Sequence, residues 1–155
     1  MRRFLKFTAL LSVLLALFAS QITAAIANPL YNFGGLGTQA NPFIIDSLED
    51  LEQLAANVSS GIHYSGATFK LTTDISVNTG RWTPIGSATM PFSGKFDGDN
   101  HKITGVSIIG TYSGLFASLK NATVSNLYVS VGSVSATFKS ETYSGVIAGY
   151  ADNST

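Results

Sequence analysis

Residues 92–112 read FSGKFDGDNHKITGVSIIGTY, and this stretch contains both of the units that recur along the chain. The first unit is an aromatic residue followed by Ser-Gly, and it begins at Tyr64, Phe92, Tyr112 and Tyr143. The second is apolar–Ser/Thr–Gly/Asn–apolar–x–apolar, with copies at 103–108 and 124–129 and a looser one at 71–77. Phe92 lies 20 residues before Tyr112, and the second unit recurs after 21 residues.

A period of about 20 residues, made of short apolar strands and tight turns, predicts one coil of a parallel β-solenoid. Alternate residues of each strand then point inward. We expect successive coils to stack Val106 and Ile108 on Leu127 and Val129, Phe96 on Phe116, and Ile103 on Val124. Gly105 and Asn126 are expected to share a turn position with positive φ. A β-sandwich is the alternative, but its strands do not normally repeat in sequence.

Residues 47–61 predict a helix. Ser47 is an N-cap candidate, and Asp50 occupies the third position of a capping box. An apolar stripe follows at helical spacing, formed by Leu48, Leu51, Leu54, Ala55 and Val58. Gly61 suits the left-handed position that ends a helix. The stripe indicates a helix that covers something apolar.

The composition excludes several classes of function. The 155 residues include 9 basic and 9 acidic side chains and no cysteine. Disulfides and thiolate-ligated metals are therefore excluded, and no cluster of cations is present for nucleic acid. Residues 62–155, rich in Gly, Ser, Thr and Asn, are expected to form the solenoid coils after an irregular lead-in at 28–46.

Residues 1–27 have the pattern of a secretory signal peptide. Arg2, Arg3 and Lys6 precede an apolar run at 7–19, and cleavage is expected between Ala27 and Asn28. The alternative is an uncleaved anchor, but a bilayer needs about 20 apolar residues. We expect an exported chain that is not inserted in the membrane after cleavage, with six basic and nine acidic groups and a net charge of −3.

No residue set predicts catalysis. Asp97, Asp99 and His101 could form a carboxylate site on an exposed strand face, as in enzymes that cleave polysaccharides. The alternative is a turn, because Gly98 lies between the two aspartates and such side chains bond nearby backbone amides. A calcium site lacks the remaining ligands of its loop, and no zinc motif occurs. We therefore expect no catalytic residue, no cofactor and no metal.

Aromatic side chains are the remaining candidates for a binding role. Trp82 and Tyr128 are the possible glycan contacts, and Tyr143 and Tyr150 could also stack on sugar rings. The alternative is that these rings pack at corners or between coils. Tyr128 is the better candidate, because its place between Leu127 and Val129 predicts a ring that points outward.

Several segments resemble the GLUG-motif repeat proteins of bacterial cell surfaces. They are GTQANPFII at 37–45, SLEDL at 47–51, FKLTTDI at 69–75, WTPIG at 82–86 and FSGKFDGDNHKI at 92–103. The repeat is degenerate, with Ala117 at its second Gly and Val146 at its Leu position. The resemblance covers about residues 37–150. It implies a right-handed parallel β-helix, all-β apart from an N-terminal capping helix.

The expected function follows from the resemblance. It implies a non-catalytic secreted or cell-surface protein of the adhesin or structural-display type, with surface glycans or proteins of host or bacterial origin as partners. The alternative is a β-helix protein that binds or cleaves polysaccharides. The last coil is expected to be incomplete at Thr155, so we also expect a fragment of a longer protein.

Overall fold

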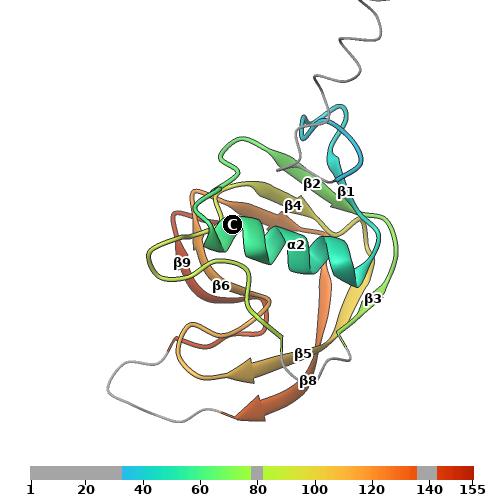
Figure 1. Ribbon diagram of the computed structural model, residues 1–155. Helices are drawn as coiled ribbons and strands as arrows, with labels where there is room; N and C mark the ends of the chain where they lie inside the picture. Colours follow the sequence, from blue (N-terminus) through green and yellow to red (C-terminus); the bar gives the residue numbers. More distant parts are fainter. Residues whose placement is uncertain (1–32, 78–81, 136–142) are drawn as a thin grey trace, which may run out of the picture. The chain divides into compact units, whose positions relative to one another are not determined.

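The computed structural model describes residues 33–77, 82–135 and 143–155 (Figure 1). The expected signal peptide and its cleavage site lie outside these residues. The elements in chain order are β1 (Phe43–Ile45), α2 (Leu48–Ser59), β2 (Thr68–Leu71), β3 (Ile75–Ser76), β4 (Lys95–Asp97), β5 (Lys102–Ile109), β6 (Phe116–Lys120), β7 (Thr123–Ser125), β8 (Tyr128–Ser135) and β9 (Ala148–Asp152). The described part of the chain is thus mostly β-structure with one short helix.

The strands form three small parallel sheets. Sheet A has the order β1-β2-β4-β7, sheet B the order β3-β5-β8, and sheet C pairs β6 with β9. Figure 1 looks along the stack and shows the chain passing from A to B to C and back to A. Every pairing between these strands is parallel. The arrangement is solenoid-like, and the antiparallel β-sandwich is excluded.

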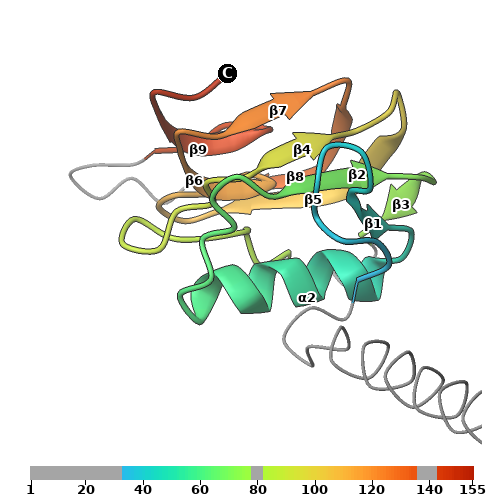
Figure 2. The ribbon, with the colours of Figure 1, turned by 90° about the horizontal axis from the view of Figure 1, so that it is seen from above.

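Helix α2 lies within the expected range 47–61 and closes one end of the stack. The Ser47 hydroxyl accepts a hydrogen bond from the Asp50 N–H at 3.2 Å, and the Asp50 carboxylate accepts one from the Ser47 hydroxyl at 2.8 Å. The buried stripe consists of Leu51, Leu54, Ala55 and Val58. Figure 2 shows α2 across the end where β1 lies, with β7 toward the other end. No helix among the described residues combines the length and apolarity needed to cross a bilayer.

The lead-in differs from expectation at its last residues. Residues 43–45 form β1, which pairs with β2 so that Phe43 faces Phe69. Phe43 and Ile45 are buried, because they are the inward positions of this short strand. The segment 28–46 is therefore not irregular throughout, and sheet A begins before the helix.

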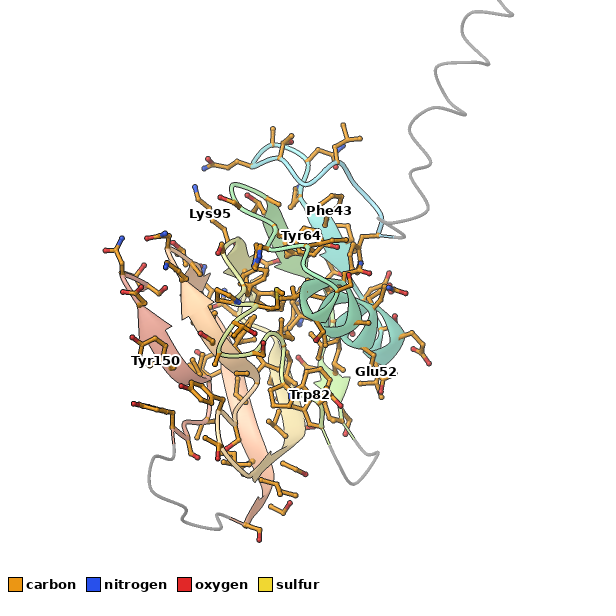
Figure 3. All side chains as sticks on the ribbon, turned by 60° about the vertical axis from the view of Figure 1, so that its left-hand side comes forward. Phe43, Glu52, Tyr64, Trp82, Lys95 and Tyr150 are labelled. Atoms are coloured by element: carbon orange, nitrogen blue, oxygen red, sulfur yellow. The ribbon has the colours of Figure 1, made fainter. Side chains whose placement is uncertain are left out.

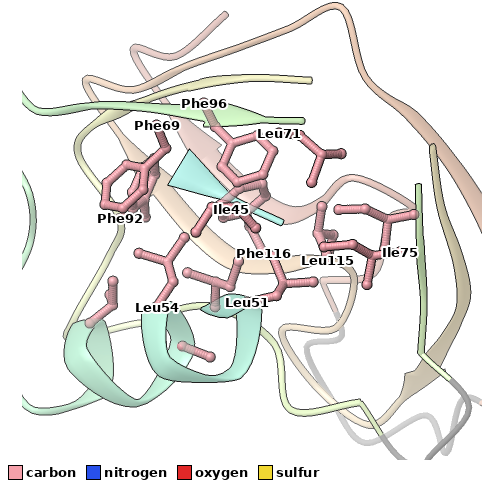
Figure 4. Packing of buried hydrophobic residues seen from close by; sticks show 14 of the residues in the cluster. Ile45, Leu51, Leu54, Phe69, Leu71, Ile75, Phe92, Phe96, Leu115 and Phe116 are labelled. Carbon is pink, nitrogen blue, oxygen red and sulfur yellow. The ribbon is translucent and has the colours of Figure 1, made fainter. Parts of the chain in front are cut away.

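The core is a column of aromatic and branched side chains inside the three sheets. One row across sheet A contains Phe43, Phe69, Phe96 and Val124. Phe69 and Phe96 are fully buried, and so are Phe92 and Phe116 beside them (Figure 4). Burial of one such ring stabilises the fold by roughly 1.5–3 kcal/mol, which makes these phenylalanines the main apolar contribution to the stack.

The coil is longer than the sequence repeat predicts. Hydrogen-bonded side chains of successive coils are 26 to 32 residues apart, so the expected period of about 20 residues is wrong. Ile103 pairs with Val129 rather than with Val124. Val124 pairs instead with Phe96, one sheet away.

The other expected stacks also change. In sheet B the partners are Val106 with Val131 and Ile108 with Val134. Phe96 and Phe116 do touch, with ring centroids 5.7 Å apart, but they meet across the core from sheets A and C. Gly105 and Asn126 both have positive φ, at 82° and 51°. They do not share a position, because Gly105 lies at an irregularity inside β5 and Asn126 at the corner between β7 and β8.

These errors have one physical cause. The copy at 103–108 lies in β5, whereas the copy at 124–129 includes the end of β7, a corner and the start of β8. Every side of a three-sided coil alternates inward apolar and outward polar residues. A six-residue pattern therefore recurs between sides that are not equivalent. The recurrence indicates a solenoid but does not give its period.

We expect the substitution Phe96→Ala to reduce the free energy of unfolding by about 3–5 kcal/mol, because it opens a cavity in the column. Urea denaturation followed by circular dichroism measures this change. Tyr128→Ala is the matched control, because that side chain is 64% exposed and its loss should change stability by about 0.5 kcal/mol or less. Equal effects of the two substitutions would contradict the assignment of the core.

Candidate functional site

The two aromatic residues predicted as glycan contacts lie in different environments. Tyr128, at the start of β8, is 64% exposed, and its ring points outward as expected. Trp82 is only 4% exposed, and its indole Nε1 donates a hydrogen bond to the Leu115 carbonyl at 3.0 Å. Figure 3 shows Trp82 against the body of the fold. Its ring has no free face for a sugar, so the packing alternative describes Trp82, and Tyr128 stays a prediction.

The acidic turn at 97–101 ties neighbouring coils together. The Asp97 carboxylate accepts hydrogen bonds from the Asp99 N–H at 3.0 Å and from the Asn126 amide at 2.9 Å. Asp99 pairs with Lys70 at 2.9 Å. His101 contacts a different carboxylate, Asp74, at 3.2 Å. The three residues proposed as a carboxylate site therefore make separate contacts with residues of the adjoining coils, as the turn alternative expects.

The electrostatics of this turn favour ionised carboxylates. The Asn126 amide and the Asp99 N–H lower the pKa of Asp97 below its ordinary value. The Lys102 N–H, with His101 beside it, lowers the pKa of Asp74 in the same direction. A general acid that works near neutral pH needs a raised pKa. These two carboxylates are thus suited to accept hydrogen bonds rather than to donate a proton.

Hydroxyl and amide side chains pair between coils on each side of the fold. Four pairs have donor–acceptor distances of 2.8–3.3 Å: Asn121 with Asn153, Ser113 with Ser144, Ser107 with Ser133, and Ser76 with Thr104. The two asparagines have φ of 52° and 46°, a conformation that Asn tolerates better than most residues. The sequence analysis missed these pairs, because only alignment at the true coil length places their members opposite each other.

Three tyrosines form a cluster near sheet C. The ring centroids of Tyr112 and Tyr143 are 5.0 Å apart, and Tyr150 lies 5.6 Å from Tyr143. Tyr112 and Tyr143 begin two of the aromatic-Ser-Gly triplets, so these triplets stack in neighbouring coils. Tyr150 is 43% exposed. The cluster matches the alternative of packing between coils for Tyr143 and leaves part of the Tyr150 ring accessible.

A trough runs over the outer face of sheet A. It has a volume of about 490 Å³ and includes the side chains of Lys70, Lys95 and Asp97. Hydroxyl groups of Thr68, Thr123 and Ser125 line the same hollow, and Gln39, Ala40 and Pro42 of the lead-in form part of its wall. The sequence analysis did not find this surface, because its residues come from the lead-in and three coils and meet only through strand register.

No group of three or more His, Asp or Glu side chains in the described ranges is placed to hold a metal ion. The geometry therefore offers surfaces rather than a reaction centre: an outward tyrosine on sheet B, a tyrosine cluster near sheet C and a polar trough on sheet A. Each can contact a ligand through hydroxyl groups, aromatic faces or single charges.

Two curated proteins share distant sequence similarity with the chain. A provisionally named Gly-rich membrane protein of Evansella cellulosilytica is 28% identical over 124 residues, which cover 77% of this chain and 14% of that protein. Halomucin of Haloquadratum walsbyi is 33% identical over 88 residues, covering 49% of this chain and 1% of halomucin. The chain thus has partial similarity to large surface proteins and matches a small share of each. No protein-family model and no solved structure matches the chain.

We expect the fold to lose stability as the pH falls below about 4. The folded pKa of Asp97 lies below its ordinary value of 3.8, so the contribution of this carboxylate is present above that value and is lost as the pH falls through the folded pKa. Asp97→Asn should weaken this dependence, since the amide oxygen can still accept both hydrogen bonds but does not titrate. Urea midpoints of both proteins between pH 6 and pH 2 measure the effect. Parallel curves would refute the role of Asp97.

Proposed function

We propose that the chain is a right-handed parallel β-helix of the GLUG-motif repeat type and serves adhesion or structural display outside the bacterial cell without catalysing a reaction. The observation that carries the proposal is the set of polar pairs between coils, which covers the outside of the fold with hydroxyl and amide groups. A repetitive outer surface gives extended contact area without a deep pocket, as solenoid proteins use it.

Three further observations support parts of this proposal. In Figure 1 the chain passes clockwise from β4 through β5 to β6, and Figure 2 has β7 farther from α2 than β4, which favours the right-handed sense. The distant similarity to large surface proteins supports a surface location. The export pattern of residues 1–27 points to the same compartment. Partners are then glycans or proteins of host or bacterial surfaces.

The test separates binding from turnover. We expect the purified protein to bind at least one class of glycan on an array and to release no new reducing ends from neutral or acidic polysaccharides. An assay for reducing sugars after long incubation measures the second outcome. Polysaccharide cleavage would overturn the non-catalytic proposal in favour of a polysaccharide-active β-helix enzyme.

A further inference from the structure

We infer that the trough on the outer face of sheet A binds an anionic glycan, with Lys95 as the contact for its acidic group. This inference rests on the proposed adhesive function and assigns a ligand class to one surface of the fold. The ligand is a sugar chain that carries carboxylate or sulfate groups. The argument starts from strand register, continues with charge, and then uses the remaining polar groups of the trough.

Register places the polar side chains in two rows across sheet A. Thr68, Lys95 and Thr123 lie opposite one another in one row. Lys70, Asp97 and Ser125 lie in the next row, two residues further along each strand. Neighbouring strands are about 4.8 Å apart, so donors and acceptors recur across the sheet at that spacing. A regular array of this kind suits an extended chain of similar units better than one compact molecule.

The hollow is large enough for part of such a chain. Its volume of about 490 Å³ lies within the range of about 300–1,000 Å³ that is usual for ligand sites. The lead-in residues at 39–42 stand at its side, where Gln39 adds an amide group. The buried ring of Phe96 lies beneath the strands and fixes the position of β4, which carries Lys95 and Asp97.

Lys95 differs from the other lysines whose surroundings the structure describes. Lys70, Lys102 and Lys120 each form an ion pair with an aspartate of another coil, at 2.9, 3.5 and 3.9 Å respectively. Lys95 has no ion-pair partner among residues 33–77, 82–135 and 143–155. An anion can therefore approach this ammonium group without breaking an existing pair. Figure 3 shows Lys95 projecting away from the strands.

The remaining groups indicate a sugar as the carrier of the negative charge. Hydroxyl groups of Thr68, Thr123 and Ser125 can donate to and accept from sugar hydroxyls. The ionised carboxylate of Asp97 accepts hydrogen bonds and would repel a densely charged polymer. A single free cation beside a carboxylate does not form the cluster of positive charge that nucleic acid requires. A chain with many hydroxyls and spaced acidic groups fits this combination best.

The test measures the affinity of purified protein for an oligogalacturonate, for dextran sulfate and for uncharged dextran by isothermal titration calorimetry. We expect binding to at least one of the two anionic probes, weakened by added salt, and no binding to dextran. Lys95→Gln should raise the Kd for that probe about tenfold, the loss expected for one charge-assisted hydrogen bond, while Lys95→Arg should retain most of the affinity. The two anionic probes distinguish carboxylate from sulfate as the recognised group.

Lys120→Gln is the matched control, because it removes one exposed lysine from sheet C, outside the trough. It should leave the Kd unchanged, and thermal unfolding of each variant checks that the fold is intact. Absence of binding to both anionic probes, or equal losses from Lys95→Gln and Lys120→Gln, would overturn the inference. Binding of a neutral glycan that depends on Tyr128 would also overturn it and leave the adhesive function standing. Release of reducing ends would contradict the adhesive proposal instead, even with binding still dependent on Lys95.

Discussion

The parallel pairing of each coil with the next one is the interaction on which the rest of the structure depends. A strand in this fold obtains its backbone partners from the coils before and after it, and not from a hairpin neighbour. Fixed register then decides everything perpendicular to the strands. It places Phe69 against Phe96 in the core and Asn121 against Asn153 outside. A slip of one residue would reverse inside and outside along a whole strand.

Features that depend on local chemistry could be predicted from the sequence. The helix is an example, since Ser47 and Asp50 are three residues apart and bond to each other whatever the rest of the chain does. The outward ring of Tyr128 is another, because alternation within one strand determines it. The parallel solenoid character followed from recurrence of short units. All of these depend on residues within one turn of helix or one strand.

Features that depend on coil length could not be predicted in the same way. Ile103 and Val129 look equivalent to many other apolar pairs, and only hydrogen bonding between β5 and β8 selects this one. Trp82 shows a different limit. Its ring is large and carries one polar group, so the same residue type serves a sugar site or a buried corner. The bond from its indole to Leu115, 33 residues away, decides between them. The trough of sheet A has the same dependence, because its two rows exist only after register is set.

The unequal spacing of paired residues has a consequence for how this fold can change. Thr68, Lys95 and Thr123 share a row, and Ser107 and Ser133 are 26 residues apart, yet Asn121 and Asn153 are 32 apart. The strands keep their pairing while the corners between them absorb the difference in length. Insertions at a corner are thermodynamically cheap, because loop closure depends only weakly on length. Evolution can therefore lengthen one corner without disturbing the stack, and each corner becomes a place where new surface is added to an unchanged scaffold.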